Sequence, residues 1–594
     1  MSRNPHRSLT ETDAILCAPG NIHETETTLV DGRLLRVYKN LWPSCRDFWL
    51  SAVGQYADRT YIVYEGHRFT YRQVHERTIK VATLFRKVYG IHKGKPNFCG
   101  DRVGICSRNH PDYLVTFWAC HLIGAVAVLA NAWQPLSPLR HCLVNTGCKL
   151  IIVDPERASV LEPIASRLRK DDGVMAFLVL DQCDRSWQHM ESFNKAIDAY
   201  PRRDDVRDLS TERIEPEDNA TIIFTSGTTG LPKGVLSTQR QFLTNVLNVL
   251  AGGFRAALRK GDPLPSVQRP GPQAGALVAV PLFHVTGSTS YSMMATLTGM
   301  KIILARKWIP EEAAREENVG VAGGVPSMVA DLIESPLAGY PLEGLLFGGC
   351  PTPDSLVGRA QKAFPKALMT QGYGLTETNS IAVSISGDDY IVRPTSTGLA
   401  CPVNEIKIVA GGKCLPPNGV GEVWLRGPNV MKGYWNDPEA TDRMITKDGW
   451  LRSGDLGYLD EEGFLYIKDR LKDIIIRGGE NVDSVTVENA LYNDPRVQEA
   501  AAVGVPDERL GELVAAVVSI KPAYQGYVTE TALMAVLLVS LPRFAVPVMI
   551  VLLHEPFEHT PSGKIIKGEL RKLARRHWED RRRNGTGREP LANL

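Results

Sequence analysis

The sequence predicts an α/β fold: a large N-terminal domain of helix-covered β-sheets with a small β-rich subdomain, then a small α+β C-terminal domain. Three observations predict it. Apolar runs of strand length, such as 149–154 and 176–181, alternate with helical stretches, which is typical of parallel sheets covered on both faces. From about 397 to 468 the chain changes to short strands with frequent glycine, which indicates an antiparallel subdomain. The length of 594 residues also exceeds one ordinary core.

The elements are expected in the following order. Residues 1–60 are expected to form a loosely structured N-terminal segment. Residues 61–85 indicate two short strands around a turn and then an amphipathic helix. Residues 252–275 are rich in Gly, Pro and basic side chains, so most of this stretch is predicted to be an exposed loop. Further buried strands are predicted at 101–109, 276–283 and 300–305.

One stretch raises the question of a membrane span. Leu114 to Trp133 contains twenty residues without Asp, Glu, Lys or Arg, which is long enough to cross a bilayer. However, Gly124 divides it into a helix-like half and a β-branched half, and His121 lies within it. We therefore predict a buried helix that leads into a buried strand, and no transmembrane span.

The overall charge narrows the possible partners. The chain has 68 basic and 66 acidic residues and a formal net charge of +2. This balance gives no global attraction to nucleic acid or to an anionic membrane. The N-terminus is polar, unlike a secretory signal. The expected partners are small molecules, and the oligomeric state stays open.

The strongest motif is TIIFTSGTTGLPKGV at 221–235. Glycines let backbone N–H groups turn toward an anion, hydroxyls donate to phosphate oxygens, and Lys233 supplies positive charge. The motif is not a Walker A loop, because Pro232 and Gly234 flank the lysine. A polyphosphate is therefore the expected ligand of a group of residues after the apolar strand: Thr225, Ser226, Gly227, Thr228, Thr229, Gly230 and Lys233.

This run resembles the phosphate loop of the adenylate-forming superfamily, which includes acyl-CoA synthetases, aryl-CoA ligases, firefly luciferase and nonribosomal peptide adenylation domains. The match continues in the expected order to Lys564. The resemblance implies an AMP-binding N-terminal domain at 1–468 and a hinge at 469–472, bounded by Asp469 and Lys472. It also implies a mobile C-terminal domain at 473–580, before a basic tail at 581–594, with the active site between the two domains.

The resemblance also assigns roles to individual residues. In QGYGLTET (371–378), Tyr373 is expected to stack on adenine, and Glu377 and Thr228 are expected to hold Mg²⁺. Lys564 in HTPSGK is implied to bridge the substrate carboxylate and the α-phosphate, although a lone C-terminal lysine is usually a surface charge. Further ATP contacts are implied for the segment FGGCP, for the 371–378 block and for the ribose side of the site: Gly349, Gly372, Gly374, Thr376, Asp455 and Arg470.

Two further segments concern coenzyme A and the acyl group. Gly478 and Gly479 resemble the glycine loop beside pantetheine, although Val482 to Ser484 depart from the family's usual sequence. His284 in PLFHVTGS resembles the gating position beside the substrate carboxylate, with a packed core histidine as the alternative. Small residues nearby leave room for an alkyl chain, and no charged residue in these blocks would pair with an amino group. The expected acyl pocket comprises His284, Thr286, Gly287 and Gly324.

Together these features predict an acid–thiol ligase that uses ATP, Mg²⁺ and coenzyme A. Lys233, Lys564, Glu377 and His284 are the expected catalytic residues. The enzyme would convert an apolar carboxylic acid to acyl-AMP and then to acyl-CoA. A medium- or long-chain fatty acid is the first expectation. The alternatives are an aryl-CoA ligase, an adenylating enzyme that loads a carrier protein in trans, a luciferase-like oxygenase, and a nucleotide-binding protein without catalysis.

The location in the cell is weakly specified. The last three residues are Ala592, Asn593 and Leu594. Peroxisomal signals are small-basic-Leu tripeptides, and this one lacks the base. We therefore expect either a peroxisomal or a cytoplasmic protein.

Overall fold

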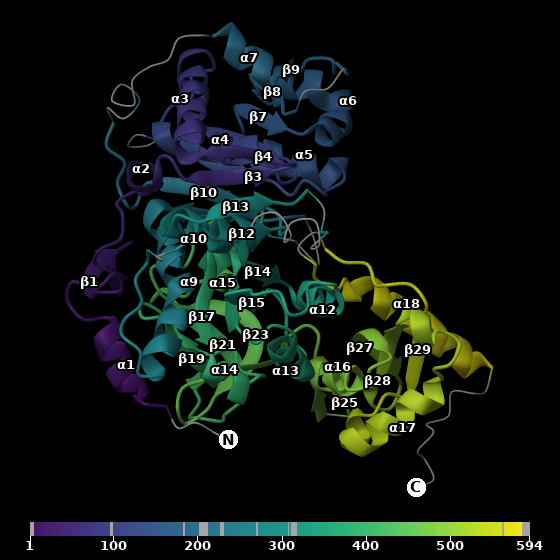
Figure 1. Cartoon of the computed structure of the whole chain (residues 1–594). Coiled ribbons are helices and arrows are strands. Elements are labelled where there is room, and N and C mark those ends of the chain that lie inside the picture. Colours follow the sequence, from purple (N-terminus) through teal and green to yellow (C-terminus); the bar gives the residue numbers. More distant parts are fainter. Residues whose placement is uncertain are drawn as a thin grey trace.

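The computed structural model is an α/β protein with two large sheets, a smaller antiparallel sheet and a separate C-terminal sheet (Figure 1). The predicted fold class is confirmed. The structure describes residues 5–94, 99–181, 185–200, 209, 212–225, 231–268, 271–306, 308–309, 318–478, 480–560 and 563–584.

The first large sheet has eight strands, and its parallel part contains the apolar runs predicted from the sequence. KLIIVD and AFLVLD supply two of its parallel strands, both buried along their whole length. In spatial order, the strands are β22 (Gly433–Tyr434), β11 (Gly234–Thr238), β10 (Asn219–Phe224), β6 (Val126–Leu129), β5 (Arg102–Cys106), β7 (Leu150–Val153), β8 (Ala176–Val179) and β9 (Glu191–Ser192).

The second large sheet has nine strands and carries the carboxyl ends at which the site is built. Its six central strands, β16 to β3 in the order below, are parallel. In spatial order, the strands are β18 (Leu399–Ala400), β17 (Ser380–Ser386), β16 (Leu368–Leu375), β15 (Gly344–Gly348), β14 (Val319–Gly324), β12 (Gly275–Val278), β13 (Lys301–Leu304), β3 (Thr60–Tyr64) and β4 (His67–Thr70).

The predicted antiparallel subdomain forms a five-stranded sheet. It consists of β20 (Lys413–Cys414), β19 (Glu405–Ala410), β21 (Gly421–Arg426), β23 (Leu451–Leu459) and β24 (Leu465–Arg470). β24 ends at the predicted hinge, and the next strand belongs to the separate C-terminal sheet. That sheet consists of β26 (Glu480–Val482), β25 (Ile475–Arg477), β28 (Gly511–Ile520), β27 (Val497–Asp507) and β29 (Met549–Leu553).

Helices cover these sheets. The amphipathic pattern in 61–85 forms the hairpin β3–β4 and then α3, where Thr70 provides an N-terminal capping box. The other main helices are α2 (Cys45–Tyr56), α3 (Tyr71–Lys87), α4 (Pro111–Ile123), α5 (Leu136–Asn145), α6 (Pro155–Asp171), α7 (Phe193–Ala199), α9 (Gln239–Arg259), α10 (Met293–Thr298), α12 (Pro326–Glu334), α13 (Asp354–Ala363), α14 (Asp388–Val392), α15 (Pro438–Met444), α16 (Ser484–Tyr492), α17 (Glu530–Ser540) and α18 (Lys567–Arg583).

The charge-free stretch at 114–133 is a buried helix followed by a buried strand. Helix α4 ends at Gly124, whose φ of 70° ends the helix in the left-handed region that glycine tolerates, and β6 follows. Apart from Asn131 and Trp133, the stretch is buried. Within the described part of the chain, no helix combines the length and apolar character that a bilayer crossing requires.

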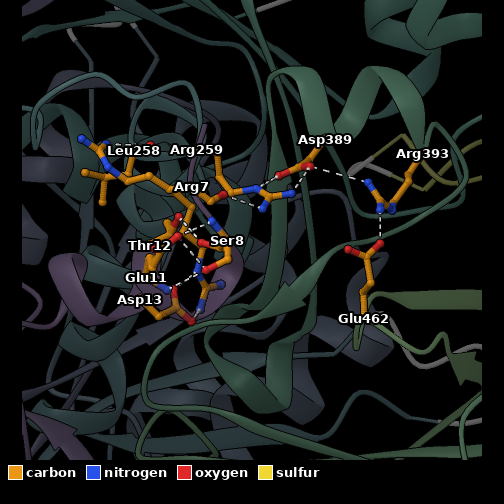
Figure 2. A network of polar contacts seen from close by, with 11 residues as sticks. Arg7, Ser8, Glu11, Thr12, Asp13, Leu258, Arg259, Asp389, Arg393 and Glu462 are labelled. Atoms are coloured by element: carbon orange, nitrogen blue, oxygen red, sulfur yellow. Dashed lines mark hydrogen bonds and ion pairs between the residues drawn. The ribbon is translucent and has the colours of Figure 1, made fainter. Parts of the chain in front are cut away.

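The N-terminal segment is more ordered than we predicted for 1–60. Helix α1 (Leu9–Leu16) packs on α9, and the hairpin β1 (Thr25–Val30) and β2 (Arg33–Tyr38) follows. Arg255 of α9 binds the Asp13 carboxylate at 2.7 Å. Figure 2 shows a second anchor, in which Arg7 donates to the Leu258 carbonyl at 2.8 Å and Arg259 donates to the Arg7 carbonyl at 2.9 Å. These partners lie far apart in sequence, so local periodicity did not show the anchoring.

The predicted loop at 252–275 begins only after α9 ends at Arg259. Gly252 lies inside this helix, where a Cβ atom would lie 2.8 Å from the Ser386 hydroxyl oxygen. The glycine therefore permits close packing of α9 on β17, and composition alone mistook it for a turn signal. Helix α18 likewise continues to Arg583, past the predicted start of the tail at 581.

Candidate active site

A cavity of about 620 Å³ lies at the carboxyl ends of three neighbouring parallel strands. Its lining includes Gly324 at the end of β14, Gly348 at the end of β15 and Leu375 at the end of β16. Ligands of α/β sheets bind at this edge. Residues of α9, β17 and the π-helix η1 (Thr286–Ser292) complete the walls.

A larger groove of about 1,990 Å³ adjoins the cavity and runs between the N-terminal and C-terminal domains. Helices α12 and α13 contribute to one side, and α16 and the chain before α18 contribute to the other. The cavity and the groove are continuous, because six residues line both: Gly349, Gly372, Gly374, Leu375, Arg470 and Lys564.

The predicted phosphate lysine reaches the inner cavity. The backbone of Thr225 and Lys233 is joined by an N–H···O bond of 3.0 Å, and both residues line the cavity. The Lys233 ammonium lies 5.0 Å from the ring centre of Tyr434 and 3.9 Å from Asp437. Ser226, Gly227, Thr228, Thr229 and Gly230 lie outside the described residues, so their predicted roles stay predictions.

Glu377 is held on the same side of the cavity. The hydroxyl of Tyr434 donates to Oε1 of Glu377 at 2.6 Å, and Thr376 lies next to it in the lining. Carboxylate and hydroxyl oxygens are suitable ligands for Mg²⁺, so these residues fit the metal. The sequence did not single out Tyr434, because its segment, GYWND, contains no recognised phosphate or metal pattern.

The predicted ribose contact lies on the groove side. Asp455 is almost fully buried, accepts from the Tyr373 hydroxyl at 2.7 Å and pairs with Arg470 at 2.9 Å. The nearby Asp455 charge raises the pKa of Arg470. Tyr373 lines the groove and is not part of the inner cavity lining. Its hydroxyl is committed to Asp455, a role we had not predicted beside stacking.

Lys564 reaches the junction of the two spaces from the C-terminal domain. A Cβ atom on Gly349, which has a φ of 86°, would lie 3.8 Å from Cε of Lys564. Enclosure by protein lowers the pKa of Lys564, and the Arg470 charge lowers it further. The lysine thus lies between the phosphate-side residues of the cavity and the ribose-side residues of the groove.

His284 borders the cavity in its neutral form. Desolvation, and then the charge of Lys564, lowers the pKa of His284 to about 3. Its Nδ1 lies 3.3 Å from the Thr286 backbone nitrogen and 3.2 Å from the Thr286 hydroxyl oxygen, which hold the ring in place. An uncharged ring at this position can border a substrate without adding a charge.

Three of the four residues predicted for the acyl pocket line the cavity. His284, Thr286 and Gly324 line the cavity, whereas Gly287 does not. A Cβ atom on Gly287 would lie 2.2 Å from the Pro281 carbonyl oxygen, so this glycine allows close backbone packing behind the wall. The sequence did not indicate several other lining residues of α9, η1 and β17, which only the fold brings together: Val249, Ser290, Tyr291, Ser380 and Ile381.

The hinge and coenzyme A residues occupy different surroundings. Asp469 is buried and accepts from the Ser484 N–H at 2.5 Å, and burial raises its pKa. Lys472 borders the groove. Gly478 lines neither space, and its N–H donates to the Leu510 carbonyl at 2.7 Å. Gly479 lies outside the described residues.

This fold and site define a class of protein. A lysine from a small C-terminal domain meets a phosphate-side lysine, an acidic residue and a buried aspartate at the carboxyl edge of an α/β sheet. That is the arrangement expected of an adenylate-forming enzyme.

Comparison with known proteins agrees. The chain belongs to the AMP-binding enzyme family: the family's main model matches residues 49–435, and the model of its C-terminal domain matches 486–564. The predicted superfamily and the predicted enzyme class, an AMP-forming acid–thiol ligase, are thereby confirmed.

Individual relatives are CoA ligases. The chain is 33% identical over 526 residues to a feruloyl-CoA synthase from Amycolatopsis sp, covering 86% of this chain and 95% of that protein. It is 31% identical over 523 residues to a 2-succinylbenzoate–CoA ligase from Bacillus mycoides (strain KBAB4), covering 87% and 96%.

A solved structure gives the same result. The o-succinylbenzoate CoA synthetase of Bacillus subtilis, in complex with its acyl-adenylate intermediate, matches with a TM-score of 0.70 and 26% identity, covering 89% of this chain and 98% of that one. The same synthetase has been solved with ATP and a magnesium ion. The expected set of ATP, Mg²⁺ and coenzyme A is therefore that of the family. These relatives are bacterial, which lends no support to the peroxisomal alternative.

Proposed function

We propose that this protein is an AMP-forming CoA ligase for an aromatic or aryl-substituted carboxylic acid. The observation that carries the proposal is the position of Lys564, where the cavity and the groove meet. At that point one ammonium can approach both the α-phosphate of ATP and the carboxylate of the acid. Feruloyl-CoA synthase and 2-succinylbenzoate–CoA ligase, the relatives named above, support the acid class.

The walls of the cavity also favour this acid class. The lining contains apolar side chains, including Val249 and Phe347, together with the hydroxyl-bearing residues Thr286, Ser290 and Ser380. A plain alkyl chain would gain no hydrogen bond from these hydroxyls, whereas an oxygen-substituted ring would. A volume of about 620 Å³ also has to hold part of the nucleotide, which suits a compact acid. The fatty acid expected first from the sequence has less support.

In the proposed first step, the acid carboxylate attacks the α-phosphorus of ATP. The P–O bond to pyrophosphate breaks, and acyl-AMP forms. Two anions must meet, so Lys233 and Lys564 place positive charge where negative charge builds. Glu377 would hold Mg²⁺, which would supply further positive charge to the pyrophosphate leaving group. Asp455 accepts from the ribose hydroxyls and fixes the nucleotide, and neutral His284 borders the carboxylate.

In the second step, the thiolate of coenzyme A attacks the acyl carbon. The thioester bond forms, the mixed-anhydride C–O bond breaks, and AMP leaves with that electron pair. Gly478, with Gly479, is proposed to admit the pantetheine arm. Because Gly478 lies outside both spaces here, this step needs another placement of the C-terminal domain.

The test is the CoA-dependent release of AMP from ATP with a panel of acids: ferulate, 4-coumarate, cinnamate, benzoate, octanoate and palmitate. We expect the aromatic acids to give the highest kcat/KM. Palmitate as the best acid would overturn the acid class. Acid-dependent pyrophosphate exchange without any effect of CoA would overturn thioester formation and favour a carrier protein as acceptor.

A further inference from the structure

The position of Lys564 depends on how the two domains meet. The cavity that it borders is otherwise lined by residues of the N-terminal domain and by Arg470 of the predicted hinge, whereas Lys564 precedes α18 of the C-terminal domain. Figure 1 shows α12 and α13 at the border between the two domains, beside α16. The contacts at this border therefore determine whether the lysine reaches the cavity.

Two polar pairs join the domains at this border. Lys521 donates to Oε1 of Glu334, the last residue of α12, at 2.7 Å. Asn489 of α16 donates to Oδ1 of Asp354, the first residue of α13, at 3.0 Å. We call these two contacts the interdomain pairs. Helix α12 begins two residues after Gly324 and α13 begins five residues after Gly349, and both of these glycines line the cavity. The pairs are thus made by helices that lead directly from the cavity wall.

A third contact between the domains lies directly beside Lys564. Gly563 has a φ of 81°, and a Cβ atom there would lie 2.5 Å from Cγ2 of Val325. Val325 immediately precedes α12 and follows the cavity residue Gly324. Gly563, directly before Lys564, thus packs against the N-terminal end of α12, the helix that carries Glu334. Placement of Lys564 in the cavity therefore requires the C-terminal domain to pack against α12.

We propose that Glu334, Lys521, Asp354 and Asn489 are positioning residues that hold Lys564 in the cavity for acyl-adenylate formation and are dispensable for thioester formation. The inference rests on the proposed function. Gly478, the C-terminal residue proposed for the second step, lines neither space while the interdomain pairs are made. The pairs must therefore break before coenzyme A reacts.

The chemistry of the pairs suits contacts that form and break in each turnover. The side chain of Glu334 is 50% exposed and that of Lys521 is 27% exposed. Such solvated ion pairs are individually weak. Polar, modest interfaces between domains are also those at which relative motion is expected. A buried apolar interface would instead hold the protein in the first half-reaction.

The experiment measures the two half-reactions separately in the full chain. Acid-dependent exchange of labelled pyrophosphate into ATP reports adenylation, and conversion of supplied acyl-adenylate with CoA reports thioester formation. Lys521→Met removes one pair, and Asn489→Asp sets a carboxylate against Asp354 without changing the side-chain size. Lys521→Arg keeps the charge. Lys39→Met is the matched control, because it removes a lysine–glutamate pair of 2.5 Å with Glu24, within the N-terminal segment.

We expect Lys521→Met to lower the exchange rate about two- to fivefold and Asn489→Asp to lower it roughly tenfold. Lys521→Arg and Lys39→Met should keep the wild-type rate, and thioester formation should stay within about twofold in all four variants. Unchanged exchange in both test variants would overturn the proposal. So would an equal fall in both half-reactions, because the pairs would then support the fold. Wild-type protein without any acid-dependent exchange would instead contradict the proposed function.

Discussion

The hydroxyl of Tyr434 donates a 2.6 Å hydrogen bond to Glu377, and the same tyrosine ring carries the Lys233 ammonium 5.0 Å from its centre. One side chain thus joins the acid proposed for Mg²⁺ and the lysine proposed for phosphate. Partners that orient a metal ligand typically change metal affinity or activity 10- to 100-fold when they are removed.

Tyr434→Phe should therefore raise the Mg²⁺ concentration needed for half-maximal pyrophosphate exchange by roughly 10-fold or more. The ring remains, so Lys233 keeps its aromatic contact and the KM for ATP at saturating Mg²⁺ should change little. Binding of Mn²⁺ with ATP, followed by electron paramagnetic resonance, gives a readout independent of turnover. Tyr458→Phe, in the antiparallel sheet, is the control. An unaltered metal requirement in Tyr434→Phe would show that Glu377 is oriented by other groups.

Lys564→Ala should abolish most of the first half-reaction while sparing the second. Loss of one preorganised positive group typically costs about 10²–10³ in rate. Pyrophosphate exchange should fall by that factor, and conversion of supplied acyl-adenylate with CoA should persist. If the variant kept wild-type exchange, the lysine would have no part in adenylation.

The alkaline limit of adenylation should report Lys564. Desolvation, and then Arg470, lowers the lysine pKa below its ordinary value of about 10.4. The protonated form supplies the charge, so exchange activity should fall as pH rises through this lowered pKa. Lys564→Arg keeps the charge to higher pH, so any residual activity of this variant should lose the alkaline limb. A limb that is identical in both proteins would assign it to another group.

The pair of His559 and Glu499 should make C-terminal stability depend on pH. The two side chains lie 2.7 Å apart, and this hydrogen bond raises the pKa of His559. The stabilisation is fully present below the unfolded pKa of about 6.5 and is lost as pH rises through the higher folded value. His559→Gln should lower Tm at pH 6 more than at pH 9 in thermal unfolding. Equal losses at both pH values would mean that the imidazolium charge contributes nothing.

The sequence was sufficient to predict features that a short, continuous segment of the chain determines. The parallel strands around KLIIVD, the break of α4 at Gly124 and the order of the motifs from Thr225 to Lys564 all follow from short segments. The sequence also indicated that Lys233, Glu377 and Lys564 share one site, because the resemblance orders them. Their meeting at the continuous cavity and groove is what the fold adds.

Features that depend on distant partners could not be predicted in this way. Tyr434 and Ser290 reach the cavity from segments with no recognised pattern. Gly287 and Gly252 are small because backbone or side chains of other elements approach them, not because they border a ligand or form a turn. The hydrogen bond of the Tyr373 hydroxyl could not be predicted either, because its acceptor, Asp455, lies 82 positions further along the chain.

The anchoring of α1 by Arg255 bears on how this enzyme can be shortened. The family match starts at residue 49, so truncation there would appear harmless. Such a truncation would delete Asp13, the carboxylate partner of Arg255. The Arg255 side chain is buried, with the residue only 7% exposed, and would keep its hydrogen bond to the Ala400 carbonyl. Losing a partner of a buried charged group costs about 1–3 kcal/mol, a sizeable part of what keeps most domains folded. The loss would destabilise the packing of α9, the helix that carries Arg255. Val249 of the same helix lines the acyl cavity. Low activity of a protein truncated at residue 49 would therefore be explained first by the loss of α1 and its anchoring to α9, before any defect in the catalytic groups.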